Sequence, residues 1–402
     1  MAHIIVIGAG QAGASLTAKL RNLGYEGDIT LIGEEPALPY QRPPLSKAYL
    51  LGDMTRERLF LRPEEFYENQ NITLRLGTKV TAIDPVAQTV TVGDEVLGYD
   101  DLALTTGSTP HHLPAAIGGT LQGVHVVRTL ADIDAMEPEF AAGKNVLIVG
   151  GGYIGLEAAA VAAKLALNVT LVEMADRILQ RVAAPETSDY FRNLHAGHGV
   201  NIVEGVGLDH LSGDTRVKSA TLTNGDTLPV DFVITGVGIK PTTELAETLG
   251  VTLDNGIKTD AQGRTSVPHV WAAGDCASFP FGGDRIRLES VPNAIDQAEV
   301  VAENMLGAGK DYIAKPWFWS DQYDVKLQIA GLNTGYNNVV TRAGDKPGAQ
   351  SHWYYQGDTL LAVDAMNDAR AYMIGKRLIE AGKSPAPDVV ASPDTELKAL
   401  LK

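Results

Sequence analysis

Short runs of consecutive apolar residues recur along the chain, and each is followed by a turn or a helical pattern. His3–Ile7 and Val146–Val149 are such runs, and each leads into a glycine-rich turn and then into apolar residues at helical spacing. A second apolar run, Ile29–Ile32 or Val169–Val172, completes each repeat. Continuously apolar strands are typical of a parallel sheet that is buried on both faces. The pattern therefore predicts two α/β units of strand, turn, helix and strand.

The composition of the chain changes beyond Pro316. Aromatic residues gather there, beginning with Trp317–Trp319, and apolar positions alternate with polar ones as they do in strands. A turn at Gln356–Asp358 and a helical pattern from about Asp368 to Ala381 follow. We predict a C-terminal α+β domain, with Ser384–Pro393 as an extended, proline-rich tail.

The charge balance excludes several classes of partner. The chain of 402 residues carries 33 Lys+Arg against 49 Asp+Glu, which gives a formal net charge of −16. Nucleic acids and anionic membrane surfaces attract basic surfaces, so we expect neither as a partner. No apolar run reaches the roughly 18 residues of a membrane span, and we expect no signal peptide before the first strand. The expected compartment is the cytoplasm.

The single cysteine, Cys276, limits the redox chemistry of the chain. One thiol cannot form an internal disulfide, a dithiol redox pair or a site for an iron–sulfur cluster. We expect Cys276 to be a small buried residue. His195 and His198 have no acid or cysteine beside them at ligand spacing, so we expect no metal site.

Each α/β repeat carries a glycine-rich turn of the form GxGxxG between its first strand and its helix. The glycines are Gly8, Gly10 and Gly13 in the first repeat and Gly150, Gly152 and Gly155 in the second. Such glycines let the backbone approach a pyrophosphate at the positive end of the helix. Glu34 and Glu173 follow the turns by about 20 residues, where a carboxylate can accept hydrogen bonds from a ribose. The repeats therefore predict two dinucleotide sites.

Glu173 also bears on which dinucleotide the second repeat binds. A carboxylate there would repel a 2′-phosphate and so favours NADH over NADPH, although Arg177 follows it closely. Two dinucleotides in a chain without a cysteine pair suggest a flavin and a nicotinamide, with a hydride passing from one to the other. Thiol–disulfide exchange is excluded, since that chemistry needs a redox pair of thiols.

Three further segments indicate which protein family the chain resembles. Pro39–Leu50 reads PYQRPPLSKAYL, Glu289–Ala294 reads ESVPNA, and Trp317–Gln322 reads WFWSDQ. With the two glycine-rich repeats, they resemble the NADH-dependent [2Fe–2S] ferredoxin reductases of bacterial oxygenase systems, within the glutathione reductase-type superfamily of two-dinucleotide flavoproteins. The resemblance runs over essentially the whole chain.

This resemblance implies the fold and its division into domains. The fold class is α/β, with two Rossmann-like dinucleotide-binding domains, one for FAD and one for NAD, plus a C-terminal α+β domain. Residues 1–108 and 236–316 would form the discontinuous FAD-binding domain. Residues 109–235 would bind NAD, and residues 317–402 would form the C-terminal domain.

The resemblance gives three residues catalytic roles. Lys47 is similar to the family lysine beside flavin N5, where a cation stabilises the negative charge that develops as the flavin is reduced. Glu157 would pair with this lysine and hold the nicotinamide carboxamide, and a glutamate in a first helical turn also interacts favourably with the helix dipole. Trp319 would lie against the flavin face, and a core aromatic of the C-terminal domain is its alternative.

The resemblance also implies the cofactor contacts. For FAD these are Gly8, Gly10, Ala12, Gly13, Glu34, Arg42, Lys47, Val80, Thr106, Gly107, Arg128, Gly274, Asp275, Val291 and Trp319. For NAD they are Gly150, Gly152, Tyr153, Ile154, Gly155, Glu157, Glu173 and Gly238. Asp275 would bind the ribityl chain, with a helix N-cap as its alternative. Tyr153 would cover the nicotinamide pocket and swing when the ligand binds.

The expected activity is that of a flavoprotein reductase. It would take a hydride from NADH onto FAD and pass single electrons to a [2Fe–2S] ferredoxin that feeds an oxygenase, with a haem monooxygenase as the first expectation. Monodehydroascorbate reductase and rubredoxin reductase are alternatives on the same fold. A non-catalytic NADH-sensing flavoprotein is the alternative from another class.

Docking of an acidic ferredoxin on a chain of net charge −16 needs a local basic patch. The candidates are Arg62, Arg285, Arg287, Lys315 and Lys326. Glu299 stands where some relatives have a basic residue, which indicates a different ferredoxin preference. No interface pattern stands out, so a monomer is the simplest expectation.

Overall fold

The computed structural model describes residues 2–402, which form two compact units. Unit 1 comprises Met1–Gln41, Arg56–Thr109 and Ile239–Pro316, and unit 2 comprises Arg42–Thr55, Pro110–Gly238 and Trp317–Lys402. The predicted FAD-binding segments lie in unit 1 except for residues 42–55 and 236–238, which belong to unit 2. The predicted division into three domains stays a prediction. None of the helices in residues 2–402 combines the length and apolar character that crossing a bilayer requires.

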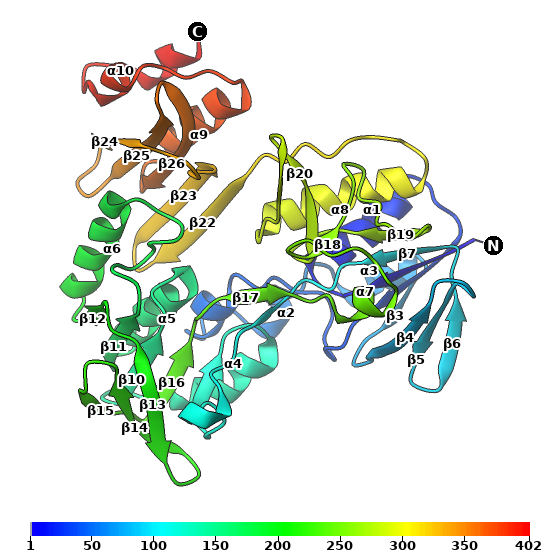
Figure 1. Cartoon of the computed structure of the whole chain (residues 1–402), viewed down its shortest axis with the longest axis horizontal. Coiled ribbons are helices and arrows are strands. Elements are labelled where there is room, and N and C mark those ends of the chain that lie inside the picture. Colours follow the sequence, from blue (N-terminus) through cyan, green and yellow to red (C-terminus); the bar gives the residue numbers. More distant parts are fainter. Residues whose placement is uncertain (1) are drawn as a thin grey trace. The chain divides into compact units, whose positions relative to one another are not determined.

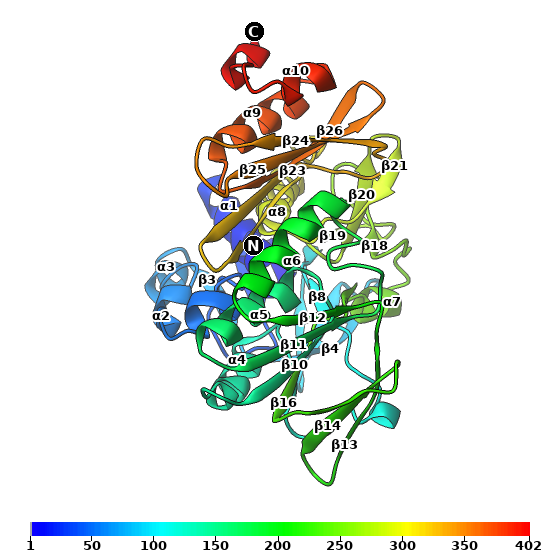
Figure 2. The same ribbon diagram turned by 90° about the vertical axis from the view of Figure 1, so that its left-hand side faces the viewer.

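Unit 1 is built on a parallel sheet with the strand order β19-β7-β1-β2-β3. Its strands are β1 (His3–Ile7), β2 (Asp28–Ile32), β3 (Ile72–Arg75), β7 (Asp101–Leu104) and β19 (Val270–Ala272). The helices α1 (Gln11–Asn22) and α8 (Val291–Met305) lie side by side on this sheet (Figures 1 and 2). Ile4 and Val6 pack under these helices, while Ile5 and Ile7 belong to the core on the opposite face. Burial on both faces explains the continuous apolar run of β1.

The second face of this sheet is covered by a small antiparallel layer. That layer consists of β4 (Val80–Asp84), β5 (Thr89–Val92) and β6 (Glu95–Gly98), which pair in this order. The remaining elements of the unit are α2 (Arg56–Leu59), α3 (Glu64–Asn69), β8 (Ser108–Pro110), β17 (Ile239–Pro241), α7 (Glu244–Thr248), β18 (Ile257–Lys258), β20 (Ala277–Phe281) and β21 (Asp284–Ile286).

Unit 2 contains a second parallel sheet, with the order β12-β11-β10-β16-β9. Its strands are β9 (Val124–Val126), β10 (Asn145–Val149), β11 (Asn168–Glu173), β12 (Asn201–Glu204) and β16 (Phe232–Thr235). Its helices are α4 (Leu130–Met136), α5 (Tyr153–Lys164) and α6 (Pro185–Gly197), and β13 (Leu208–Gly213), β14 (Val217–Leu222) and β15 (Thr227–Pro229) form an antiparallel layer. The two predicted repeats are confirmed as β1-α1-β2 and β10-α5-β11.

The C-terminal part of unit 2 is an antiparallel sheet with the order β22-β23-β26-β25-β24. The strands are β22 (Trp317–Gln322), β23 (Val325–Gly331), β24 (Asn338–Ala343), β25 (Gln350–Gln356) and β26 (Thr359–Met366). The predicted helix is confirmed as α9 (Ala369–Glu380), which packs on this sheet and is capped by Asp368. The tail is not wholly extended, because Pro387 starts the short helix α10 (Pro387–Ala391) and proline suits the first position of a helix.

A buried polar cluster joins α6 to the C-terminal sheet within unit 2. The Thr187 hydroxyl lies 2.8 Å from Asp364 Oδ2 and 2.7 Å from His352 Nδ1, and the Tyr354 hydroxyl donates to the same carboxylate. All four side chains are buried. Burial raises the pKa of Asp364 to about 6 and lowers the pKa of His352 to about 4, since it disfavours the charged form of each.

We expect the free energy of unfolding to fall when the pH is lowered from 7 to 5. His352 stays neutral in the folded protein down to about pH 4, whereas the unfolded chain binds a proton at this histidine below about pH 6.5, so stability is lost across this range. The share of His352 in this loss is about 2 kcal/mol at pH 5. Asp364 has the opposite effect on stability. Its raised pKa means that the folded protein binds a proton at this carboxyl group more readily than the unfolded chain does. Asp364 therefore adds to the free energy of unfolding as the pH falls from about 6 towards 3.8.

Chemical denaturation of the wild type and the His352→Gln variant at pH 7 and pH 5 checks this prediction. The variant should lose about 2 kcal/mol less than the wild type between the two pH values. An equal loss in the two proteins would show that His352 does not carry the acid sensitivity.

Candidate active site

The first glycine-rich turn connects β1 to α1. Gly8 has a φ of +114°, a conformation that suits glycine and few other residues. A Cβ atom on Gly13 would lie 2.1 Å from the Gly8 carbonyl oxygen, so the helix can pack this closely only without a side chain there. Gly10, the N-cap of α1, is open: a Cβ atom added to it would meet no atom of residues 2–402 within 4 Å. This open position is the place where a ligand can approach the backbone.

The second glycine-rich turn repeats this geometry between β10 and α5. Gly150 has a φ of +107°, and a Cβ atom on Gly155 would lie 2.0 Å from the Gly150 carbonyl oxygen. Gly152, the N-cap of α5, is again open within the described part of the chain. The two turns therefore share one arrangement, with one glycine packed tightly against the strand and another facing open space.

Both turns fit the pyrophosphate of a dinucleotide. The first N–H groups of a helix have no partner inside the helix. In the described residues no side chain caps α1 or α5, so these N–H groups are not satisfied by a capping hydrogen bond. The positive end of the helix dipole also favours an anion at this position. The residues present thus fit one dinucleotide at each turn.

The two acids that were expected to bind ribose differ in their surroundings. Glu173, the last residue of β11, accepts hydrogen bonds from the backbone N–H groups of Gly151 (2.7 Å) and Ala175 (2.8 Å). These bonds fix its carboxylate beside the second turn. Glu34 follows β2 as an exposed side chain, and its carboxylate lies 3.3 Å from Lys79 Nζ in a surface ion pair. The acid of the second site is therefore held in place more firmly than that of the first.

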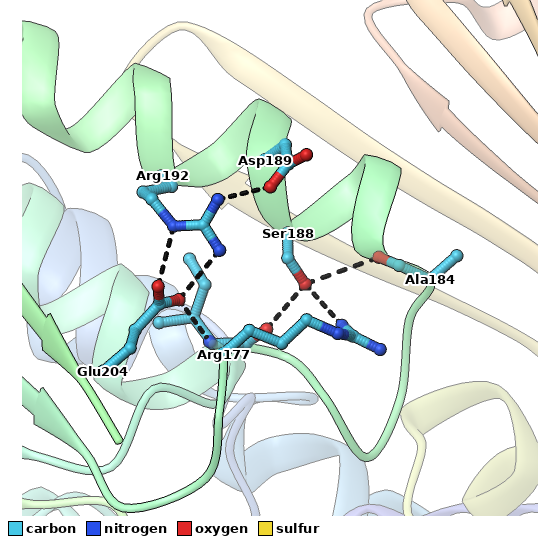
Figure 3. Close-up of polar contacts among 7 residues, drawn as sticks. Arg177, Ala184, Ser188, Asp189, Arg192 and Glu204 are labelled. Carbon is cyan, nitrogen blue, oxygen red and sulfur yellow. Dashed lines mark hydrogen bonds and ion pairs between the residues drawn. The ribbon is translucent and has the colours of Figure 1, made fainter. Parts of the chain in front are cut away.

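The sequence left open whether Arg177, which follows Glu173 closely, offsets the charge of this glutamate. In the structure, the Arg177 side chain is engaged by other residues. Its guanidinium donates to Ser188 Oγ (2.5 Å) and to the Ala183 carbonyl (2.8 Å), so it is engaged by its own loop and by α6. Figure 3 shows this contact beside a second one, in which Arg192 binds the Glu204 carboxylate at 2.9 and 3.0 Å. Both guanidinium groups serve internal contacts, which leaves Glu173 to set the charge beside the turn.

A buried ion pair lies near the N-terminus of α5. Lys47 Nζ is 2.9 Å from Glu157 Oε1, and the hydroxyls of Ser46 and Ser320 donate to the same carboxylate at 2.8 and 2.7 Å. Glu157 is only 4% exposed. A weaker contact joins Lys47 to Asp321 at 3.9 Å. The pairing of Lys47 with Glu157 that the resemblance implied is present, and the two serines add to it.

The backbone around Lys47 explains how the lysine reaches α5. Residues Leu45–Tyr49 form one π-helical turn that packs on α5, and π-helical turns are frequent at functional sites. Lys47 departs from helical geometry within this turn, with φ −135° and ψ −110°. The Lys47 side chain extends from this kink to Glu157.

The electrostatics of the ion pair depend on burial. Loss of hydration raises the pKa of Glu157, while Lys47, Ser320 and Ser46 oppose this rise because each stabilises the carboxylate. A buried carboxylate with a cation and two hydroxyl donors can remain ionised at neutral pH. The site therefore holds a carboxylate on α5, two residues after the last glycine of the second turn, together with its paired cation.

Aromatic residues precede Ser320 in β22 and Glu157 in α5. Trp319 and Trp317 of β22 stack with their ring centroids 5.5 Å apart, and Phe318 contacts Tyr153 at 5.0 Å. The Tyr153 hydroxyl is buried and has no hydrogen-bond partner among residues 2–402. An unpaired buried hydroxyl is costly, so the expected movement of Tyr153 on ligand binding could relieve this cost.

Two of the remaining residues expected to contact FAD meet at the end of β19. Gly274 and Ala12 approach closely, since a Cβ atom on Gly274 would lie 3.0 Å from that of Ala12. Asp275 accepts a hydrogen bond from the Ser108 hydroxyl at 2.9 Å and is only partly buried. A carboxylate thus stands at the C-terminal end of the parallel sheet, the edge at which α/β folds bind their ligands.

The other expected FAD contacts of unit 1 include both surface and core positions. The Thr106 hydroxyl donates to the Thr242 carbonyl at 2.6 Å, and Gly107 beside it has a φ of +70°. Val291 is the first residue of α8. Val80 is 5% exposed, and its side chain packs in the core against β5 and β7.

Four of the expected cofactor contacts lie elsewhere in unit 2. The Arg42 guanidinium donates to the Arg128 carbonyl at 2.6 Å, so these two residues lie together. Gly238 has a φ of +99°, and its carbonyl accepts a hydrogen bond from the His111 N–H at 3.0 Å. Ile154, next to Tyr153, is 43% exposed.

Several basic residues that were candidates for docking are engaged within unit 1. The Arg287 side chain is 10% exposed and pairs with Glu289 at 2.5 Å. Arg285 donates to the carbonyls of Thr259 and Ser278. Glu299 pairs with Lys19 at 3.3 Å. These arginines thus contribute to the internal structure of the unit.

Sequence reasoning missed four polar residues of the ion-pair region. They are Ser46, Ser320, Gln322 and His195. Ser46 and Ser320 donate to Glu157, while Gln322 hydrogen-bonds to Ser320 and His195 to Gln322. Ser46 and Ser320 are adjacent to Lys47 and Trp319, and that adjacency was the available signal. The expectation that Cys276 is a small buried residue is confirmed, and burial raises the pKa of its thiol.

Known proteins resemble this chain over its whole length. Residues 2–298 match the pyridine nucleotide-disulphide oxidoreductase family, and residues 317–401 match the reductase C-terminal family. A ferredoxin–NAD(P)(+) reductase of Sphingomonas sp is 44% identical over 384 residues, which cover 94% of this chain and 92% of that protein. Putidaredoxin reductase of Pseudomonas putida is 39% identical over 407 residues, with coverages of 99% and 96%.

A solved structure supports the same assignment. The chain matches the covalent putidaredoxin reductase–putidaredoxin complex with a TM-score of 0.96 and 38% identity, over 100% of this chain and 98% of that chain. This match spans both glycine-rich turns and the C-terminal sheet, since it covers the whole chain. The chain therefore belongs to the pyridine nucleotide-disulphide oxidoreductase family and, within it, to the ferredoxin reductases.

Proposed function

We propose that the protein is a flavoprotein that oxidises NADH and reduces a [2Fe–2S] ferredoxin, which in turn serves an oxygenase. The observation that carries this proposal is the buried Lys47–Glu157 pair near the second glycine-rich turn, in a chain with one cysteine. A charge pair in place of a thiol pair suits hydride and electron transfer, since disulfide exchange needs a reactive thiolate. The family and its named members support the same acceptor.

The residues of the chain bind and orient NADH and FAD. The bound FAD supplies the redox chemistry by accepting two electrons from NADH and releasing them singly. The N–H groups at the start of α5 bind the NADH pyrophosphate, and Glu173 binds the adenosine ribose. Glu157 accepts a hydrogen bond from the nicotinamide carboxamide, and Lys47 keeps this carboxylate charged. Phe318 contacts the rings of Tyr153 and Trp319, the two aromatic residues expected at the nicotinamide and the flavin.

The FAD contacts keep the roles that the resemblance implied. The N-terminus of α1 would bind the FAD pyrophosphate, Asp275 would bind the ribityl chain, and Lys47 would stabilise negative charge on the reduced flavin. The remaining expected contacts are those given in the sequence analysis. We also place the protein in the cytoplasm, which cell fractionation can check.

We expect a preference for NADH over NADPH that depends on Glu173. The carboxylate beside the second turn accepts hydrogen bonds from ribose hydroxyls and repels a 2′-phosphate. Changing Glu173→Gln keeps the shape of the side chain but removes the charge. The ratio of kcat/KM for NADH to kcat/KM for NADPH should then fall about tenfold or more.

Steady-state kinetics with the two nucleotides measures this ratio. Glu34→Gln is the matched control, since it removes a comparable acid beside the other turn and should leave the ratio unchanged. A wild-type ratio in Glu173→Gln would contradict the assignment of selectivity to this residue.

The acceptor is tested by NADH oxidation with the purified, FAD-containing protein. The panel contains several [2Fe–2S] ferredoxins coupled to cytochrome c, a rubredoxin and the ascorbate radical. Ferredoxin-dependent turnover well above the rate with cytochrome c alone is the expected result. Turnover only with rubredoxin or only with the ascorbate radical would show that ferredoxin is not the acceptor. An absence of turnover with every acceptor would favour a nucleotide-sensing role.

A further inference from the structure

A line of buried hydrogen bonds in unit 2 ends on Glu157. It begins at His195 of α6, whose Nε2 lies 2.8 Å from Gln322 Oε1. Gln322 Nε2 lies 3.2 Å from Ser320 Oγ, and Ser320 donates to Glu157 Oε1 at 2.7 Å. His195, Gln322 and Ser320 are each 0% exposed. The line connects α6 to α5 through two residues of β22 that point to the same face.

The chemistry of these groups allows one direction of donation. The Glu157 carboxylate can only accept, so Ser320 gives it its single proton and must itself accept from the Gln322 amide nitrogen. The Gln322 oxygen then faces His195, which has to donate from Nε2 and accept at Nδ1. The Tyr323 hydroxyl lies 3.0 Å from Nδ1 and supplies that proton. Every donor along the line therefore points towards Glu157.

The outer end of the line is held by the turn between β22 and β23. Tyr323 has a φ of +55°, which is uncommon for a bulky residue, and its ring stacks on His198 at 3.7 Å and an interplanar angle of 7°. Burial lowers the pKa of His195 to about 4, so this residue is neutral at neutral pH, as the direction of the line requires.

From this geometry we propose that Gln322 and His195 are positioning residues for Glu157. They hold the Ser320 hydroxyl as a permanent donor to the carboxylate, so that Glu157 stays charged and oriented when a nicotinamide dinucleotide binds. The proposal rests on the proposed function, because it deepens the role given there to Glu157. A serine hydroxyl alone can rotate, whereas one that accepts from a buried amide on one side keeps its proton directed to the other.

A purely structural role is the competing explanation, since the same line also ties α6 to β22. Thr187 provides a matched control because it is a second buried residue of α6 that is hydrogen-bonded to the C-terminal sheet. Thr187→Val breaks that connection without touching the line to Glu157. A structural role predicts that Thr187→Val and Gln322→Met have the same effects, whereas positioning predicts that they differ.

The first measurement follows the ionisation of Glu157 by NMR in the FAD-containing protein labelled with ¹³C at the glutamate carboxyl carbons. Glu157→Gln identifies the resonance. The groups that face this carboxylate are Lys47 and Ser46 from the π-helical turn and Ser320 from β22, with Asp321 lying 3.9 Å from Lys47. Gln322→Met should raise the pH at the midpoint of Glu157 ionisation by about 0.5 or more. The reason is that the Ser320 hydroxyl, which donates to the charged carboxylate, is no longer held in place. Thr187→Val should leave this midpoint unchanged.

The second measurement is the Kd for NAD⁺ in a double-mutant cycle of Gln322→Met and Ser320→Ala. Each single variant should raise the Kd by about 3–10-fold, the range expected for one hydrogen bond. In the Ser320→Ala background, Gln322→Met should have almost no further effect, because Gln322 acts through the serine hydroxyl. Additive effects of the two substitutions would overturn the proposal, as would an equal shift of the Glu157 midpoint in Thr187→Val.

A third measurement uses the wild-type protein and therefore does not depend on whether a variant folds. The ¹⁵N shifts of His195 should show the neutral form protonated at Nε2 at pH 7. Protonation at Nδ1 alone would make Nε2 an acceptor, which would reverse the direction of donation through Gln322 and overturn the proposal. None of these readouts needs an electron acceptor, so a protein that fails to reduce ferredoxin would refute the proposed function and leave the positioning test standing.

Discussion

Replacing Lys47 with methionine will lower the rate of NADH oxidation by about 10²-fold or more and will also destabilise the protein. Methionine keeps much of the volume of the lysine stem but leaves Glu157, 4% exposed, without its cation. An uncompensated buried charge costs about 3–5 kcal/mol, unless the carboxyl group is protonated instead. Either outcome removes the fixed carboxylate that holds the nicotinamide. Stopped-flow kinetics and chemical denaturation measure the two effects.

Two further variants separate the loss of the ion pair from general damage to the site. Lys47→Met combined with Glu157→Gln removes both charges, so stability should return to within about 1 kcal/mol of the wild type while activity stays low. Asp321→Asn removes only the weaker contact of Lys47, at 3.9 Å and with 43% of the aspartate side chain exposed. Its effect on stability should be below about 1 kcal/mol. Normal turnover in Lys47→Met would contradict the role of the pair.

Replacing Gly152 with alanine will weaken NADH binding by about tenfold or more while leaving the fold almost unchanged. Gly152 has φ −79° and ψ −179°, which alanine can adopt, and a Cβ atom there would meet no atom of residues 2–402 within 4 Å. The methyl group would instead occupy the space through which the backbone approaches the pyrophosphate. The Kd for NAD⁺ and the Tm of the FAD-containing protein check the two parts of this prediction.

Gly155 and Gly10 provide the matched comparisons. A Cβ atom on Gly155 would lie 2.0 Å from the Gly150 carbonyl oxygen, so Gly155→Ala should destabilise the turn itself by about 1–3 kcal/mol and lower the Tm. Gly10→Ala changes the open position of the first turn and should lower FAD retention, with the second turn intact. If Gly152→Ala bound NAD⁺ as the wild type does, the second turn would not be the pyrophosphate site.

These two predictions depend on different parts of one architecture. The glycine-rich turns are local structures, in which one glycine packs helix on strand and another leaves the backbone open. The ion pair is a non-local structure, since Lys47, Glu157 and Ser320 come from a π-helical turn, a helix and a strand that are distant in the sequence. A variant at the open glycine Gly152 should therefore change binding with little effect on stability, whereas loss of Lys47 should change turnover and stability together.

The sequence by itself determined the fold class and the two dinucleotide turns. Apolar runs at β1 and β10 are continuous because both faces of a parallel sheet are buried, and the GxGxxG spacing places Gly13 and Gly155 where helix and strand touch. Such features act over a few residues, so local periodicity records them. The family resemblance added Lys47, Glu157 and Trp319, which motif spacing alone would not have joined.

The tertiary structure alone decided what surrounds these residues. It showed that Arg177 is engaged by Ser188, that the tail contains α10, and that residues 42–55 pack within unit 2. It also brought His195, Gln322 and Ser320 into one line ending on Glu157. A hydrogen bond depends on distance and direction between atoms that the chain brings together only when it folds, so no spacing along the sequence could have revealed that line.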